Sequence, residues 1–295
     1  MYPLNYDLPV YRPPSEWRSL LLQVTIGCSN NKCTYCDMYR SKSYRVRSIE
    51  DIFKDIDTCK TSGPVPEKIF LCDGDALGAP MEILESTLLY LRKCFPKVRS
   101  IGIYATAENI LQKTAKELLR LKELGLSIAY LGLESGDNKI LHMIVKGNTA
   151  EQMVEASLKL KQCQIKLSTI VMLGVGGKKL TDQHQRETAK VLSLTCPDYL
   201  SFLTTFAVPG TPYAKMVEKG LISPLTTKEL LKEMYTIISE GQFNSNPVLF
   251  RANHVSNQIP IGGTLPRDQK KLIALLDKAY KDCPKGVYPT APNQM

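Results

Sequence analysis

The sequence lacks several features that would place the protein in a membrane or outside the cell. It contains no uninterrupted apolar run of about 18 residues, the length that a membrane-spanning helix needs. The segment Met1–Pro14 mixes proline, tyrosine and aspartate without the basic start and apolar core of a secretory signal. Only three histidines occur, and none stands in the setting of a corrin-binding domain, so cobalamin is not expected. We therefore expect a cytoplasmic protein with no membrane partner.

The composition excludes intrinsic disorder and argues against a disulfide framework. Apolar residues make up 43% of the 295 positions and charged residues 23%, which is typical of a globular protein with a substantial core. The nine cysteines occur in a long chain without a secretion signal, a setting in which thiols stay reduced. Lys and Arg number 38 against 29 Asp and Glu, a net charge of +9 that favours anionic partners without identifying one.

Short apolar segments alternate with segments of helical periodicity along most of the chain. The first strand is predicted over 20–26 and the first helix over 49–59. The later predicted strand and helix pairs are 68–72 with 81–94, 100–104 with 108–124, 127–133 with 149–163, 166–173 with 182–194, and 199–206 with 213–219 and 228–240. This alternation predicts a parallel α/β sheet, either barrel-like or doubly wound.

No linker-like stretch divides the alternating series, so one core domain is predicted over 18–241. An N-terminal segment over 1–17 precedes it, and a C-terminal extension over 242–295 follows. The extension is predicted to contain a helix over 266–280, with Pro266 in its first turn, where proline is tolerated.

Three cysteines lie close together at the end of the first predicted strand, whereas the other six are scattered singly. Cys28, Cys33 and Cys36 are separated by gaps of four and two residues, which allows one loop to aim all three thiols at one point. Three thiolates leave a structural zinc site one ligand short. In a four-iron cluster they leave one iron open for a substrate or cofactor. Zinc, a dithiol pair and unrelated cysteines remain the alternatives.

This loop resembles that of the radical S-adenosylmethionine superfamily, whose members hold a [4Fe–4S] cluster with three cysteines after the first strand of a partial (β/α)6 barrel. Tyr35, the aromatic residue before the last cysteine, belongs to the same pattern, although the first gap is one residue longer than usual. The resemblance extends over about 20–212. It implies an α/β fold of this partial-barrel type, S-adenosylmethionine as cofactor, and Cys28, Cys33 and Cys36 as cluster ligands.

The resemblance assigns cofactor-binding roles to residues at the ends of two later strands. Asp73-Gly74-Asp75 stands where the superfamily receives the methionyl ammonium on backbone carbonyls and an acidic side chain. Glu134 and Lys146 match residues of the Elongator-like and coproporphyrinogen oxidase-like branches that bind the ribose hydroxyls and the methionyl carboxylate. The alternatives are an Asp-Gly turn, a helix-capping glutamate and a surface lysine.

Two further segments have candidate roles. Gly174 matches the end of a superfamily strand whose apolar side chain packs on the adenine ring, although no polar contact carries over. In the C-terminal extension, Arg251 suits a carboxylate or phosphate, and His254 can transfer a proton near neutral pH. We predict that both lie at the barrel mouth near the substrate, with a structural role in turns as the alternative.

The implied protein is an oxygen-sensitive oxidoreductase or transferase with a single cluster, because no second group of cysteines occurs. It would cleave S-adenosylmethionine reductively to a 5′-deoxyadenosyl radical that abstracts hydrogen from an unidentified anionic substrate, a small molecule or RNA. Electrons would come from an external donor of the flavodoxin or ferredoxin type. The alternative from another class is a non-catalytic iron–sulfur or zinc-binding scaffold or electron-transfer module.

Overall fold

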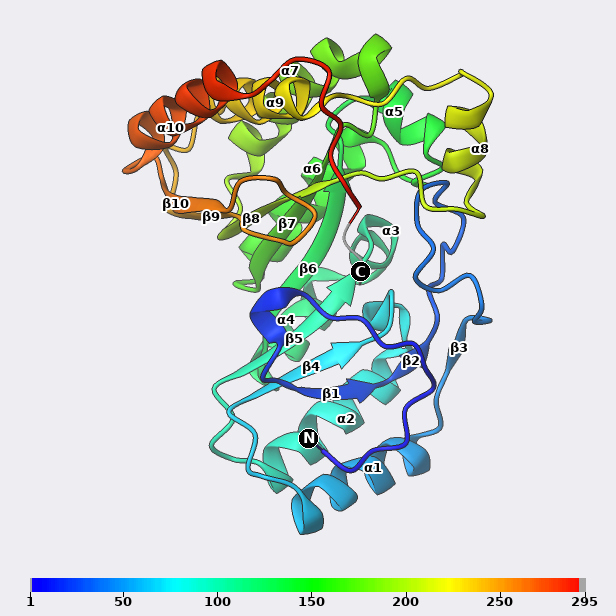
Figure 1. Ribbon diagram of the computed structural model, residues 1–295. Coiled ribbons are helices and arrows are strands. Elements are labelled where there is room, and N and C mark those ends of the chain that lie inside the picture. Colours follow the sequence, from blue (N-terminus) through cyan, green and yellow to red (C-terminus); the bar gives the residue numbers. More distant parts are fainter. Residues whose placement is uncertain (1, 292–295) are drawn as a thin grey trace. The chain divides into compact units, whose positions relative to one another are not determined.

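The computed structural model describes residues 2–291, which form two compact units of alternating strands and helices (Figure 1). The first unit takes in the described residues up to Asn31, with Asp37–Leu131 and Glu155–Leu167, and the second takes in Lys32–Cys36, Gly132–Val154 and the described residues from Ser168 onward. Within residues 2–291, no helix is both long enough and apolar enough to cross a membrane.

The first unit is built on parallel strands in the order β1-β4-β5-β6. These strands are β1 (Leu20–Gln23), β4 (Lys68–Cys72), β5 (Ser100–Ala105) and β6 (Leu126–Glu134), of which 126–131 belong to this unit. All of β1 and four residues of β4 are buried. Such continuous apolar runs are typical of parallel strands covered on both faces. A short antiparallel pair joins β2 (Thr25–Ile26) to β3 (Arg45–Val46).

The helices of the first unit are α1 (Ile49–Ser62), α2 (Met81–Cys94), α3 (Ala107–Gln112), α4 (Ala115–Glu123) and the part of α6 (Ala150–Gln162) from Glu155 onward, with short 3-10 turns η1 (Pro14–Glu16) and η2 (Ala76–Gly78). Three of these helices follow a polar residue whose side chain caps them: Ser48 before α1, Thr106 before α3 and Thr114 before α4. The single helix predicted over 108–124 is wrong. Thr114 and Glu117 form a capping box there, each side chain accepting the other residue's backbone N–H, so a new helix begins.

The second unit continues the pattern with parallel strands β7, β8 and β9 and an antiparallel last strand, β10. Their bounds are β7 (Lys166–Leu173), of which 168–173 belong to this unit, β8 (Tyr199–Thr204), β9 (Val248–Ala252) and β10 (Ile261–Leu265). The helices are α5 (Asn138–Met143), α7 (Gly177–Thr195), α8 (Pro212–Glu218), α9 (Thr227–Glu240) and α10 (Gln269–Asp282). Helix α9 packs against both α7 and α10 (Figure 1).

The predicted α/β class is confirmed, and the bounds of β4, α2 and β7 agree with the sequence prediction. The helix predicted over 266–280 begins three residues later, at Gln269, so the placement of Pro266 in its first turn is wrong. Strand β9 extends the sheet of the second unit by pairing with β8. The predicted boundaries at 17/18 and 241/242 remain predictions.

A polar network of buried Glu233, His184 and Ser135 with half-buried Thr181 lies in the core of the second unit. Glu233 on α9 accepts the N–H of Gly174 and the hydroxyl of Thr181, both at 2.6 Å. On α7, His184 places Nδ1 2.8 Å from the hydroxyl of Ser135 and Nε2 3.5 Å from the Glu233 carboxylate. Because Ser135 follows β6 and Gly174 follows β7, the network ties the ends of two strands to two helices.

Burial shifts both titratable groups of this network toward their neutral forms. It raises the pKa of Glu233 to about 7, although hydrogen bonds from Thr181 and Gly174 oppose the rise. The stability that this shift contributes is complete below the ordinary glutamate pKa and is lost as pH rises through about 7. Burial lowers the pKa of His184 to about 3, so its contribution is present above the ordinary histidine pKa and is lost as pH falls.

We expect Glu233→Gln to remove one of these two opposed pH dependences, because glutamine retains an acceptor for Gly174 but cannot ionise. The stability of the wild type relative to this variant should fall by roughly 3 kcal/mol as pH rises from below about 5 to above about 7. Urea denaturation across this range measures the difference. The same change at exposed Glu240 on α9 is the control, and it should leave the wild-type pH dependence intact. A pH-independent difference at Glu233 would contradict the argument.

Candidate functional site

In the first unit, the loop after β2 and the loop after β4 are bonded to one another. The N–H of Gly74 donates to the carbonyl of Gly27 at 3.0 Å. A Cβ atom at position 74 would lie 2.6 Å from Cβ of Cys28 and 2.9 Å from the Tyr39 ring. Glycine is therefore required at position 74, because only a residue without a side chain allows the loop to approach Cys28 this closely.

Asp73 is fully buried, and each of its carboxylate oxygens accepts a hydrogen bond. Oδ1 accepts from the side-chain amide of Gln23 at 3.1 Å, and Oδ2 accepts from the N–H of Gly27 at 2.8 Å. Lys42 forms an ion pair with Oδ2 at 2.9 Å, and its side chain is only 3% exposed. These bonds fix the turn that leads into Cys28.

Asp75 is also buried, but its two oxygens differ. Oδ2 accepts from Ser29, from Asn109 and from Thr106, the last at 3.4 Å. Oδ1 is buried and has no hydrogen-bond partner among the described residues. Burial raises the pKa of Asp75 to about 6, although the three donors oppose this shift. A buried acceptor without a partner is unfavourable, and an ammonium group is a donor that would satisfy it.

In the second unit, Cys33 and Cys36 lie on one tight turn. The N–H of Cys36 donates to the carbonyl of Cys33 at 3.2 Å, and both side chains are half-exposed. Thr34 anchors this turn, because its N–H donates to the carbonyl of Ile144 at 2.9 Å and its own carbonyl accepts the N–H of Tyr213 at 3.1 Å. The backbone therefore fixes the turn independently of the two thiols.

The structure brings three predicted cofactor residues of the second unit together at the end of β6. Lys146 places Nζ 2.9 Å from Oε1 of Glu134, and the hydroxyl of Tyr35 is hydrogen-bonded to the same carboxylate. Burial and the Glu134 charge raise the pKa of Tyr35, which keeps its hydroxyl protonated as a donor. A Cβ on Gly132 would collide with the Glu134 carboxylate and lie 2.9 Å from the Lys146 ammonium. Gly132 thus leaves the space in which the pair forms.

Two non-glycine residues at strand ends adopt a left-handed backbone. Asp73, directly after β4, and Glu134, the last residue of β6, both have φ of 63°. This conformation is uncommon for residues with a side chain, and such strained residues cluster at functional sites. The strain supports a functional role for the ends of these two strands.

Gly174, at the end of β7, has φ of +77° and borders a cavity of about 210 Å³. The hydroxyl of Tyr213 donates to the Gly174 carbonyl at 3.3 Å and lines the same cavity. Other residues that line it are Thr205, Phe206, Ala207, Pro224, Leu225, Leu230, Tyr288 and Pro289. The predicted Gly174 position therefore lies beside a partly apolar hollow.

The two predicted substrate residues have different surroundings. Arg251 is exposed on β9 and lines a separate cavity of about 420 Å³, whose lining does not include His254. His254 is half-buried, with Nδ1 2.8 Å from the hydroxyl of Ser256, and the Ser256 N–H also donates to it at 3.2 Å. Burial lowers the pKa of His254. These contacts favour the turn-closing alternative for His254.

The residue types fit a [4Fe–4S] cluster and its cofactor. Three half-exposed thiols on one short loop are of the type that ligates such a cluster, and the unsatisfied Asp75 Oδ1 is of the type that accepts from an ammonium group. Cys28 belongs to the first unit, whereas Cys33 and Cys36 belong to the second. Across residues 2–291, no three His, Cys, Asp or Glu side chains are gathered as a ready metal site. The assignment therefore rests on the donor chemistry of the loop.

The sequence pattern does not reveal the residues that bind the carboxylates of Asp73 and Asp75. Lys42 and Asn109 are separated from Asp73 and Asp75 by 31 and 34 positions, and no local pattern marks either of them. The sequence pattern likewise gives no role to His184. Long-range packing brings all three into place.

Residues 22–192 match a family model described as the Radical SAM superfamily. A tRNA-2-methylthio-N(6)-dimethylallyladenosine synthase of Wolbachia pipientis subsp. Culex pipiens is 25% identical over 286 residues, which are 91% of this chain and 63% of that protein. The 4′-phospho-dehydrooxetanocin synthase of Priestia megaterium is 27% identical over 156 residues, 47% of this chain and 21% of that protein. This chain thus spans less than two thirds of each relative.

The solved structure of the archaeal Methanocaldococcus infernus Elp3, with an N-terminal deletion, resembles this chain with a TM-score of 0.52 at 17% identity. The match covers 92% of this chain and 64% of that one, and it confirms the predicted fold. The family model covers more than half of the chain and includes the three-cysteine loop and the ends of β4, β6 and β7. The chain therefore belongs to the radical S-adenosylmethionine superfamily, whose enzymes use a [4Fe–4S] cluster and S-adenosylmethionine as cofactors.

Proposed function

We propose that this chain is a radical S-adenosylmethionine enzyme that abstracts hydrogen from an anionic substrate. When bound, the cluster and S-adenosylmethionine supply a 5′-deoxyadenosyl radical by one-electron reductive cleavage. The observation that carries the proposal is the buried, unsatisfied Oδ1 of Asp75, because it lies on a loop bonded through Ser29 to the Cys28 segment. A cluster scaffold or electron carrier has no need of such an acceptor.

The two aspartates after β4 have different proposed roles, one in binding the cofactor and one in positioning the loop. Asp75 receives the methionyl ammonium on Oδ1, while Oδ2 stays bonded to Ser29, Thr106 and Asn109, which orients the carboxylate. Asp73 has no unpartnered oxygen for an ammonium group, because both of its oxygens already bind protein groups that fix the loop before Cys28. We therefore assign Asp73 as a positioning residue.

In the second unit, Glu134 and Lys146 hold the other polar ends of the cofactor. A carboxylate accepts from two vicinal ribose hydroxyls, and an ammonium pairs with the methionyl carboxylate. Their mutual ion pair and the Tyr35 hydrogen bond keep both side chains ordered before the ligand arrives. We assign Cys28, Cys33 and Cys36 as cluster ligands. We also propose that the backbone at Gly174 lies against the adenine ring of the cofactor.

An RNA or a phosphorylated small molecule is the substrate class that we favour. One relative is named for a tRNA nucleoside and another for a phosphorylated product, and this chain carries a net charge of +9. An external donor of the flavodoxin or ferredoxin type is proposed to supply the electron.

We expect Cys33→Ala to abolish the cluster, whereas Cys94→Ala should leave it intact. Anaerobically reconstituted wild type should hold about four irons and about four acid-labile sulfides, and Cys33→Ala should lose the visible absorbance. Cys94 is the matched control because it is also half-exposed but lies on α2, outside the loop. Stoichiometric zinc without sulfide in protein purified under anaerobic conditions would contradict the proposal and favour a zinc scaffold.

We expect Asp75→Asn and Asp73→Asn to separate binding from stability. Asp75→Asn removes the charge that receives the ammonium, so S-adenosylmethionine affinity should fall by about 1–3 kcal/mol while the iron content stays unchanged. Asp73→Asn leaves the buried Lys42 with only the longer ion pair to the partly exposed Asp7 carboxylate at 3.9 Å, so the free energy of unfolding should fall by about 1–3 kcal/mol. Equilibrium dialysis with labelled S-adenosylmethionine and urea denaturation measure the two effects. Unchanged affinity in Asp75→Asn would reject its assignment.

A further inference from the structure

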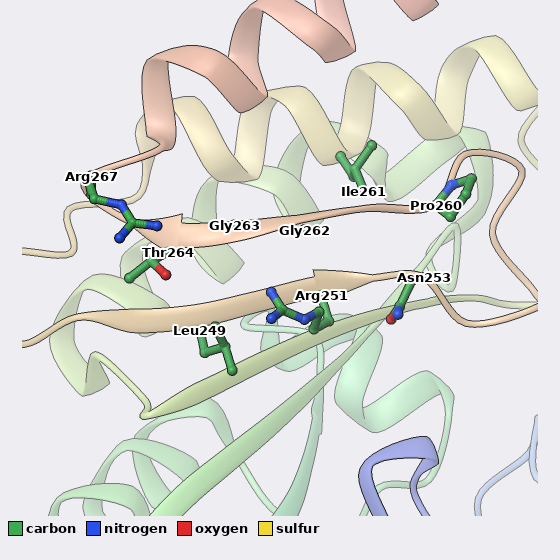
Figure 2. A pocket seen from close by; sticks show the side chains of 9 residues that line it. All are labelled: Leu249, Arg251, Asn253, Pro260, Ile261, Gly262, Gly263, Thr264 and Arg267. Atoms are coloured by element: carbon green, nitrogen blue, oxygen red, sulfur yellow. The ribbon is translucent and has the colours of Figure 1, made fainter.

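The outer face of the β9–β10 hairpin carries the 420 Å³ cavity (Figure 2). In the antiparallel register Arg251 lies opposite Gly262, and Leu249 lies opposite Thr264, so these residues share one face. The intervening β9 residues are buried on the other face; they are Val248, Phe250 and Ala252. The cavity is therefore a feature of the face of the hairpin that points away from the core.

The nine described residues that line this cavity include two arginines and no acidic residue. Arg251 and Arg267 are both exposed, and Asn253 and Thr264 add an amide and a hydroxyl. Figure 2 shows the Arg251 side chain extending along the hairpin toward the end at which Thr264 and Arg267 lie. Cationic donors thus converge on one hollow, which favours an anionic ligand.

Some N–H groups of each guanidinium already donate to protein acceptors, which holds the side chain in place. Nη1 of Arg251 donates to the carbonyl of Phe250 at 2.8 Å. Arg267 donates twice to Asp268, at 3.0 and 2.8 Å, and Asp268 is itself held by the N–H of Thr264 at 2.8 Å. Since a guanidinium offers five N–H donors, both arginines keep donors for a ligand and lose little side-chain freedom on binding.

Gly262 sets the position of Arg251. A Cβ atom at position 262 would lie 3.1 Å from both Cδ and Nη1 of Arg251, and 3.0 Å from the Phe250 carbonyl. These distances are tighter than ordinary van der Waals contact. The absence of a side chain on Gly262 therefore lets Arg251 lie flat against β10.

We propose that this cavity binds a phosphate group of the substrate, either a phosphodiester of RNA or the phosphate of a small molecule. The inference rests on the proposed function and names the site that would hold the anionic part of its substrate. Two planar guanidinium groups match the geometry of phosphate oxygens. The predicted extension from 242 onward carries seven Lys and Arg against three Asp and Glu, which attracts a polyanion toward the hairpin.

The test measures binding to the reconstituted full chain in the absence of S-adenosylmethionine. The probes are a fluorescein-labelled single-stranded RNA, followed by fluorescence anisotropy, and AMP as a competitor. Arg251→Ala and Arg267→Ala should each raise the dissociation constant about 10-fold or more. Each change should also reduce the salt dependence of RNA binding by about 0.7 in the logarithmic slope.

Two further variants separate the geometry of the site from its charge. Lys278→Ala removes one positive charge from an exposed position on α10 that does not line the cavity, and it should change the dissociation constant by less than about 3-fold. Gly262→Ala keeps every charge but displaces Arg251, and it should weaken binding several-fold. Losses of equal size at Lys278, Arg251 and Arg267, or none at either arginine, would overturn the proposal.

The competition identifies the source of the phosphate. If AMP binds as tightly as RNA and with the same dependence on the arginines, the site suits a phosphorylated small molecule; if RNA binds far more tightly, it suits a polynucleotide. The proposed function is tested separately, by measuring 5′-deoxyadenosine formation by the wild type. Absence of that product would refute the radical chemistry without altering the phosphate result.

Discussion

The buried ion pair between Lys42 and Asp73 is the contact on which the loops around Cys28 in the first unit depend. Both side chains are removed from water, and such a pair stabilises a fold only when its remaining donors and acceptors are satisfied. That condition is met, because Gln23 and the N–H of Gly27 bind Asp73, and the Asp7 carbonyl accepts from Lys42 at 2.5 Å. The pair thereby fixes the N-terminal segment, the turn into Cys28 and the end of β4 together.

The buried carboxylates of this protein differ in how fully they are satisfied, and that difference separates structural from ligand-binding roles. Asp73 and Glu233 accept hydrogen bonds on both oxygens from within their own units. Asp75 leaves one buried oxygen without a partner among the described residues, and Glu134 is held by two side chains that are themselves polar and partly exposed. We therefore expect a bound ligand to be the remaining partner of Asp75 and Glu134.

The sequence predicted the elements that local pattern controls. The apolar run of β4 and the periodicity of α2 define their own bounds, and the three-cysteine loop identified the superfamily. The break at Thr114 was also readable, since Thr114 and Glu117 have capping-box spacing, but the apolar periodicity on both sides concealed it. The positions of polar residues directly after predicted strands indicated which residues were candidates for the site.

The pairing of those residues could not be predicted in the same way. Asp73 and Asp75 look equivalent in sequence, and only distant partners distinguish them. Those partners are brought close by the packing of loops and helices, as is the contact between Ser135 and His184 across 49 positions. The proposed division between a positioning and a binding aspartate therefore depends on the folded chain.

The left-handed backbone at Glu134 lowers the stability of the fold in order to place a carboxylate at the end of β6. A glutamate in this conformation carries a strain of about 1–2 kcal/mol that glycine would not. Replacement by glycine would relieve the strain and yet remove the carboxylate that Lys146 and Tyr35 hold. If Glu134 binds the cofactor as proposed, selection for stability and selection for cofactor binding act in opposite directions at this position. At the end of β6, a change made for thermal stability would therefore weaken the proposed cofactor binding.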